Sequence, residues 1–154
     1  MIRFIYFFTF LIMLSVSAFS RSSAYVVDVM DGDSIQVEVS TGRIVHIRLF
    51  GIDAPELNQY FGQLSKQYLS KLILNKDVMI ELLDEDQYGR RLAFIYDDGG
   101  NNVNLDLVRS GYAWVYRQYF SDPKWIVTEQ QAKASELGLW QQNFPTPPWV
   151  FRRR

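Results

Sequence analysis

Beyond its first twenty residues, the first half of the chain alternates apolar and polar positions with the period of β-strands. Residues 25–30 are apolar and β-branched, and the tight-turn pair Asp31-Gly32 separates them from the alternating residues 35–39. This pattern predicts a β-hairpin. Residues 43–50 alternate again until Pro55 ends the pattern, which predicts a third strand with one buried and one open face.

Two more strands and three helices follow from the later pattern. Residues 78–83 and 92–96 read as strands, and apolar residues recur at helical spacing over residues 61–75. Residues 102–110 predict a second helix that Gly111 closes. A third helix starts at Ser121-Asp122-Pro123, where a capping residue precedes a proline, and is predicted to run to Leu137.

The order of these elements predicts the fold class. Five strands with a helix inserted after the third are typical of a small antiparallel barrel of the OB type, here followed by two helices. We therefore expect an α+β, mainly β protein with one domain over residues 21–141. The proline- and arginine-rich tail, residues 142–154, is expected to be extended, with its terminal arginines in solvent.

The first twenty residues have the pattern of a secretory signal peptide. A short start carrying Arg3 precedes the almost wholly apolar residues 4–14, and small residues follow. We expect cleavage after Ser20, with Ala18 and Ala24 as alternative sites. A retained membrane anchor is the other interpretation, but the apolar stretch is short of the roughly 20 residues that span a bilayer. The sequence thus predicts a secreted or periplasmic protein.

Composition narrows the chemistry that the domain can perform. The chain has no cysteine, so neither disulfides nor thiol catalysis are available. Its 16 Lys and Arg face 17 Asp and Glu, and removal of residues 1–20 takes away only Arg3. This balance is less basic than that of a protein gripping nucleic acid through many phosphates, so any positive charge that binds a polyanion must be local.

Three segments place charged side chains at the ends of strand-like runs. They supply two aspartates, Asp33 and Asp53, one glutamate, Glu56, and two arginines, Arg48 and Arg90. Carboxylates can hold a hard cation and handle an attacking water, while guanidinium groups neutralise a phosphate. In combination, these residues favour cleavage of a phosphodiester bond.

Each segment also has a simpler interpretation. Asp31-Gly32-Asp33 has the composition of an ordinary hairpin turn, and Arg48, Arg90 and Arg91 fit charged positions on open faces or edges of strands. The single histidine, His46, fits an exposed strand position, which disfavours a Ser-His-Asp mechanism and a zinc site. A bound metal would need oxygen ligands and would therefore be Ca²⁺ or Mg²⁺.

Taken together, three segments resemble the thermonuclease (staphylococcal nuclease-like) family: Asp31-Gly32-Asp33-Ser34, Arg48 to Glu56, and Tyr88 to Ala93. The similarity runs from about Tyr25 to Trp140 and includes the order of strands and helices. It implies an OB-fold nuclease, monomeric like the family's prototype, that uses Ca²⁺ to hydrolyse DNA and RNA and leaves 3′-phosphorylated products.

The resemblance implies roles in metal binding and proton transfer. Asp33 and Asp53 match the two calcium-binding carboxylates of the family. Ala54 matches the position whose backbone carbonyl completes the protein's share of the coordination, and Glu56 matches the general base. Two carboxylates, a carbonyl and waters suit the irregular oxygen shell of Ca²⁺.

It also implies how the substrate is held. Arg48 and Arg90 match the two arginines on the scissile phosphate, for which a planar donor fork is better suited than lysine. Tyr88 matches an aromatic residue beside the phosphate. Tyr116, with Tyr119 as the alternative, matches a base-stacking tyrosine, although packing beneath the last helix would equally explain these aromatic residues.

Some positions depart from the family's prototype. Ala54 replaces a threonine, Gln87 replaces a lysine, and residues 57–63 contain no basic residue, so we expect weaker substrate affinity. Two other functions stay open at this stage. One is a non-catalytic OB module that binds nucleic acid or protein, and the other is an envelope domain anchored by its N-terminus.

Overall fold

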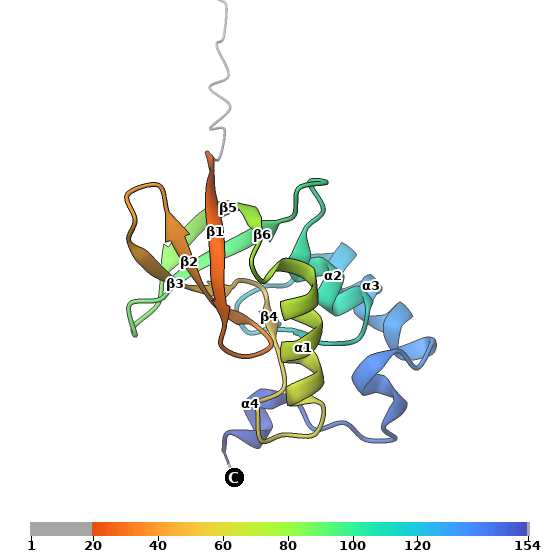
Figure 1. The fold of residues 1–154 in the computed structure, drawn as a ribbon. Helices are drawn as coiled ribbons and strands as arrows, with labels where there is room; N and C mark the ends of the chain where they lie inside the picture. Colours follow the sequence, from red (N-terminus) through yellow and green to blue (C-terminus); the bar gives the residue numbers. More distant parts are fainter. Residues whose placement is uncertain (1–19, 154) are drawn as a thin grey trace, which may run out of the picture.

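The computed structural model of the protein describes residues 20–153, and Figure 1 shows a β-barrel with helices packed along one side. The predicted signal peptide lies outside the described residues, except for Ser20. Within residues 20–153, no helix has the length and apolar character needed to cross a bilayer.

Five strands close into a barrel in the order β1-β2-β3-β6-β5. They are β1 (Arg21–Val29), β2 (Ser34–Val39), β3 (Ile44–Leu49), β5 (Asp77–Glu85) and β6 (Arg91–Tyr96). The predicted barrel is confirmed, but β3 and β6 pair in parallel, so the barrel is mixed and not antiparallel. An odd number of strands cannot close with every neighbour reversed, so at least one pairing must be parallel.

Side chains along each strand point alternately into and out of the barrel, and the inward ones are branched or small apolar residues. The interior positions are fully or almost fully buried: Ala24, Val26, Val29, Ile35, Val37, Ile47, Leu49, Val78, Ile80, Ala93 and Ile95. Their neighbours along the strands point outward, so Arg48 lies on the outer face of β3 between Ile47 and Leu49. The strand that forms the barrel wall therefore also presents a candidate site residue.

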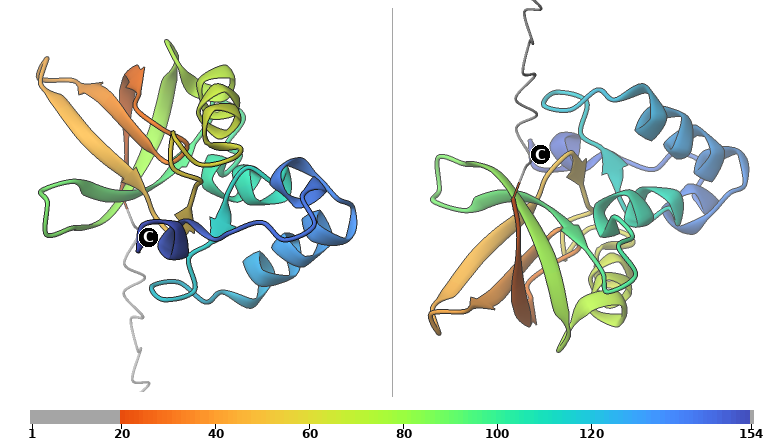
Figure 2. Two further views of the ribbon diagram at one scale, coloured as in Figure 1. Left: turned by 90° about the horizontal axis from the view of Figure 1, so that it is seen from below. Right: turned by 90° about the horizontal axis from the view of Figure 1, so that it is seen from above.

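Helices cover one side of the barrel (Figure 2). They are α1 (Gly62–Ile73), α2 (Val103–Arg109), α3 (Pro123–Ala134), the 3-10 turn η1 (Gly138–Gln141) and α4 (Pro148–Phe151). Asn102 and Asp122 cap α2 and α3 through their side chains. Helix α3 ends three residues before the predicted Leu137, because the backbone at Glu136 is left-handed with a φ of 50°. The tail predicted as extended contains the short helix α4.

A pair of two-residue strands extends the fold beyond the barrel. Strand β4 (Ile52–Asp53) pairs antiparallel with β7 (Trp114–Val115). The buried side chain of Asn104 supports this region, because its Nδ2 donates to the carbonyls of Phe50 and Ala93, at 2.9 and 3.1 Å. The chain leaving β3 is thus held at a defined position, which fixes where Asp53 lies.

Candidate active site

The turn between β1 and β2 places Asp33 inside the protein. The Asp31 carboxylate accepts the backbone N–H of Asp33 at 2.9 Å, which closes an Asx turn. Gly32 packs so closely that a Cβ there would lie 2.6 Å from Cβ of Ala54 and 2.8 Å from Cβ of Ser65. The hairpin turn is therefore pressed against β4 and α1, and Asp33 is only 5% exposed.

Arg48 joins the two predicted metal-binding aspartates. One nitrogen, Nη2, lies 3.0 Å from Oδ2 of Asp33 and 2.9 Å from Oδ1 of Asp53. Its other terminal nitrogen donates to the carbonyls of Leu49 and Ile52, at 3.0 and 3.1 Å. The guanidinium is thus held by four oxygen atoms, and the predicted convergence of Asp33, Arg48 and Asp53 is observed.

Ala54, the residue after β4, closes the same cluster. Its backbone N–H donates to Oδ2 of Asp33, so the backbone at Ala54 lies directly beside that carboxylate. Asp53 is 1% exposed and Ala54 is also buried. Two carboxylates and neighbouring backbone oxygens form a donor set of oxygen atoms alone, which suits a hard cation such as Ca²⁺.

Burial makes the charged form of the Asp33 carboxylate expensive. Desolvation raises the pKa of Asp33 to about 8; the Arg48 guanidinium opposes the rise, and the charges of Asp31 and Asp53 add to it. A divalent cation beside Asp33 would favour the charged form of this carboxylate. The carboxylate oxygens of Asp33 and Asp53 therefore fit the Ca²⁺ that the resemblance implies.

Glu56 and Asp53 are linked by a residue that the sequence analysis placed in solvent. Arg152 donates from Nη1 to Oδ1 of Asp53 at 3.1 Å and to Oε1 of Glu56 at 2.7 Å, and from Nη2 to Oδ2 of Asp53 at 2.8 Å. The expectation of solvent-exposed terminal arginines is therefore wrong for Arg152. An arginine run at the end of a chain carries no periodicity that could have indicated this contact.

Arg90 and Tyr88 lie in the turn between β5 and β6, apart from this cluster. Arg90 is two residues before Leu92, which is the parallel partner of Arg48, so both arginines belong to the same outer face. Its guanidinium pairs with Asp86 at 2.8 Å. In the part of the chain that the structure describes, Arg90 forms no hydrogen bond or ion pair with either aspartate or with Glu56. Tyr88 is 74% exposed.

Tyr116 follows β7 and stacks against a residue of the C-terminal segment. Its ring lies 5.6 Å from that of Trp149, with an interplanar angle of 18°, and Tyr119 meets Tyr116 edge-on. The stacking partner belongs to α4 and not to the predicted third helix, so the aromatic packing of Tyr116 is with the C-terminal segment. Base stacking by Tyr116 stays a prediction. Tyr119 remains exposed.

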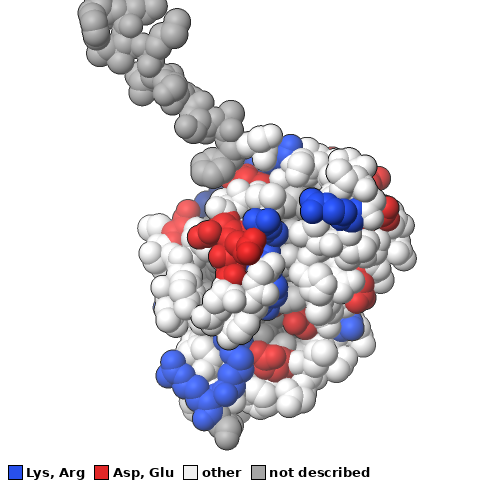
Figure 3. All heavy atoms as spheres, turned by 90° about the vertical axis from the view of Figure 1, so that its left-hand side faces the viewer, with Lys and Arg blue, Asp and Glu red and all other residues white. Residues whose placement is uncertain are grey.

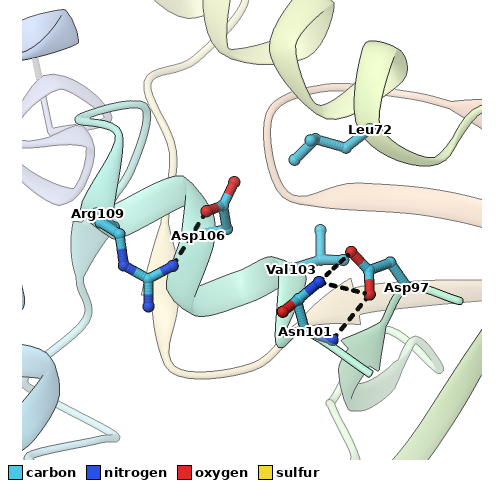
Figure 4. A pocket seen from close by; sticks show the side chains of 6 residues that line it. All are labelled: Leu72, Asp97, Asn101, Val103, Asp106 and Arg109. Atoms are coloured by element: carbon cyan, nitrogen blue, oxygen red, sulfur yellow. Dashed lines mark hydrogen bonds and ion pairs between the residues drawn. The ribbon is translucent and has the colours of Figure 1, made fainter. Parts of the chain in front are cut away.

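Elsewhere in the described chain, a hollow at the barrel is lined by Arg43, His46, Tyr88 and Arg90 but by neither aspartate nor Glu56. No three His, Cys, Asp or Glu side chains in residues 20–153 are grouped so that they could hold a metal ion. A pocket between α1 and α2 contains none of the predicted site residues, and its acids are already paired, Asp97 with Asn101 and Asp106 with Arg109 (Figure 4). His46 is exposed and contacts Gln36, as expected for a strand position.

Comparison with known proteins gives a consistent result. A family model described as "Staphylococcal nuclease homologue" matches residues 46–142. An "Uncharacterized endonuclease" of Escherichia coli O157:H7 is 43% identical over 129 residues, which are 84% of each chain. An "Uncharacterized endonuclease" of Haemophilus influenzae is 39% identical over 92% of this chain and 79% of its own. A "Micrococcal nuclease" of Shigella flexneri is 35% identical over 92% of this chain and 87% of its own.

Proposed function

Since the chain belongs to the staphylococcal nuclease homologue family and is a nuclease, we propose that it hydrolyses DNA or RNA with Ca²⁺ held beside Asp33 and Asp53. The observation that carries this proposal is the single Arg48 nitrogen held between two buried aspartates, one in the β1–β2 turn and one in β4. A structural ion pair would need only one carboxylate. The second one supplies the negative charge that a divalent cation and a phosphate-binding arginine can share.

Each side chain of the cluster has a role that follows from its chemistry. Asp33, Asp53 and the backbone carbonyl of Ala54 would hold the ion, which when bound supplies positive charge to the phosphate and lowers the pKa of coordinated water. Glu56, partly open to solvent, can accept a proton from an attacking water. The terminal nitrogens of Arg48 are held by four protein oxygens, so Arg48 would bind the phosphate oxygens that gain charge by exchanging its contacts with the aspartates for them.

Arg90 would complete the phosphate site from the neighbouring turn. Its side chain is 36% exposed and is held by Asp86 alone, so it can turn toward a phosphate on the outer face that it shares with Arg48. Tyr88 lies beside it, with the Arg90 guanidinium 5.6 Å from the Tyr88 ring. Tyr88 and Tyr116 would contact sugars or bases without sequence preference.

A cleavage assay tests this function directly. We expect the purified protein to degrade DNA or RNA in Ca²⁺, to lose activity in a chelator and to regain it when Ca²⁺ is restored. Glu56→Gln should lower the rate by about 100-fold or more because the proton acceptor is lost. Glu38→Gln, an exposed carboxylate on β2, is the matched control and should cleave like the parent. Chelator-resistant cleavage, or full activity of Glu56→Gln, would contradict the assignment.

The proposed site of action is outside the cytoplasm. The support is the apolar stretch over residues 4–14 with small residues after it, the pattern of a cleaved leader. We expect the mature protein to start near Arg21 and to be recovered from the periplasm or the medium. N-terminal sequencing of fractionated material checks this, and a membrane-bound protein that retains residues 1–20 would contradict it.

A further inference from the structure

The C-terminal segment, residues 146–153, is docked against the candidate active site. The side chain of Gln59, just after Glu56, donates to the Thr146 carbonyl at 2.6 Å. Trp149 packs against Tyr116 and lies edge-on to Trp114 at 5.7 Å. Pro148 is buried. These contacts fix the segment without using the acidic cluster, and Figure 2 shows α4 beside β4.

The docked segment places the Arg152 guanidinium against Asp53, a proposed metal ligand, and against Glu56, the proposed general base. Arg152 follows α4 directly, and its backbone N–H donates to the Pro148 carbonyl at 3.0 Å, which orients the residue at the helix end. The side chain forks across both oxygens of Asp53 and reaches Glu56. Among the described residues, Arg152 is the ion-pair partner that the structure gives Glu56.

Asp53 keeps one acceptor position that neither arginine uses. A carboxylate offers about four such positions, and Arg48 and Arg152 donate three N–H groups to it. A glutamate at the surface has several rotamers of similar energy. Arg152 is anchored by its fork on Asp53, so the single contact from its Nη1 to Oε1 restricts where the Glu56 carboxylate lies.

We propose that Arg152 is a positioning residue of the active site, which holds the Glu56 carboxylate in a fixed place relative to Asp53. The C-terminal segment is then part of the catalytic unit and not an appended tail. This inference rests on the proposed function, because it matters only if Glu56 takes part in hydrolysis. Basic side chains gather at the C-terminal end of the chain on the face shown in Figure 3, so a neighbouring arginine can serve as a control.

The test compares Arg152→Gln, Arg152→Lys and the matched control Arg153→Gln in the full chain. Arg153 is exposed and forms no ion pair within residues 20–153. At saturating Ca²⁺, we expect Arg152→Gln to lower kcat on DNA by about 10- to 100-fold with KM within about threefold of the parent. Arg152→Lys should recover part of the loss, because an ammonium keeps the charge without the fork. Arg153→Gln should match the parent.

Two further measurements separate positioning from other roles. In a Glu56→Gln background, Arg152→Gln should lower kcat no further, because residues acting as a unit are not additive. Calorimetric titration with Ca²⁺ should give Arg152→Gln an affinity equal to or above that of the parent, since a neighbouring positive charge is removed. Melting curves identify any variant that fails to fold.

Three results would overturn the inference. One is a kcat for Arg152→Gln within twofold of that for Arg153→Gln, which makes Arg152 dispensable. Another is a raised activity together with tighter Ca²⁺ binding, which identifies the segment as a competitor for the site. The third is an increase in KM alone, which indicates simple phosphate binding. If the parent and Arg153→Gln both fail to cleave, the proposed function fails first and this inference falls with it.

Discussion

Arg48 and Arg90 are assigned the same task, yet the fold holds them in different ways. Arg48 is 12% exposed and is fixed by two carbonyls and two carboxylates that belong to the β1–β2 turn, β3 and β4. Arg90 is 36% exposed and is fixed by Asp86 from its own turn. One half of the phosphate site is therefore set by the packing of the domain, and the other half is set by a hairpin. Stability and activity should be coupled at Arg48 and separable at Arg90.

The largest effect is expected for Arg48→Met, which removes the guanidinium but keeps most of the side chain's volume. Activity should fall by about 100-fold or more, and unfolding should become easier by about 3–5 kcal/mol because the buried Asp33 carboxylate loses its ion-pair partner, whereas Asp53 keeps Arg152. Chemical denaturation and a cleavage assay measure both effects. Ca²⁺ should restore stability in part without restoring activity.

The matched control for this variant is Arg43→Met, an exposed arginine before the same strand. It should leave both stability and activity close to those of the parent. Equal stability of Arg48→Met and Arg43→Met would show that the arginine is not needed to hold the aspartates.

The next largest effect is expected for Arg90→Lys, which should lower activity by about 100-fold through loss of the planar fork. Its stability should stay within about 0.5 kcal/mol of the parent, because the ion pair with Asp86 is at the surface. Arg91→Lys is the control, since Arg91 pairs with Glu85 at the same turn. Parental activity in Arg90→Lys would remove Arg90 from the phosphate site.

A smaller effect is expected from the group that holds Arg90. Burial acts to raise the pKa of Asp86, but the N–H groups of Arg90 and Tyr88 and the Arg90 guanidinium outweigh it and lower this pKa below its ordinary value. The charged carboxylate therefore stabilises the fold above the pKa of the unfolded chain, and this contribution is lost as the pH falls through the lower, folded-state pKa. Asp86→Ala should cost about 1 kcal/mol at pH 7.

Chemical denaturation of Asp86→Ala and of the parent across pH 2–7 measures how this contribution depends on pH. The difference in their free energies of unfolding should be constant near neutrality and should shrink toward acidic pH. A difference that does not depend on pH would contradict the role of the carboxylate charge. Asp84→Ala, at the exposed neighbouring strand end, is the control.

The smallest effect is expected for Gln87→Lys, which restores the lysine of the family's prototype beside Tyr88. Affinity for DNA should rise a few-fold, and the slope of log K against log salt should steepen by about one. Titrations at several salt concentrations measure this. An unchanged slope would mean that residue 87 does not contact a phosphate.

Much of the fold follows from local sequence patterns. The β1–β2 hairpin and the capped starts of α2 and α3 carry their own signals, namely alternation, the Asp31-Gly32 turn and the capping residues Asn102 and Asp122. The parallel pairing of β3 with β6 was not predictable, because it arises from closing five strands into a ring. Strands of two residues, as in β4 and β7, are too short to show any period.

In the site too, residues with a local sequence pattern were predictable, and residues placed by long-range packing were not. Asp33, Arg48 and Asp53 lie at the ends of strands, where local pattern and resemblance agree, and the structure brings them together. Arg152 reaches Asp53 across 99 residues of chain, so its role depends on how the tail docks. Glu129 is buried and binds Arg117 and Lys133. The sequence did not indicate this burial either, because an acidic residue on a helix is usually exposed to solvent.

The docked C-terminus has a practical consequence for anyone who purifies this enzyme. A polyhistidine tag fused after residue 154 would begin three residues beyond Arg152, within reach of the acidic cluster. Imidazoles bind divalent transition metals, so leached nickel or zinc could be delivered to the catalytic carboxylates and counted as inhibition. Preparations tagged at the other end, or with the tag removed, should give the higher specific activity.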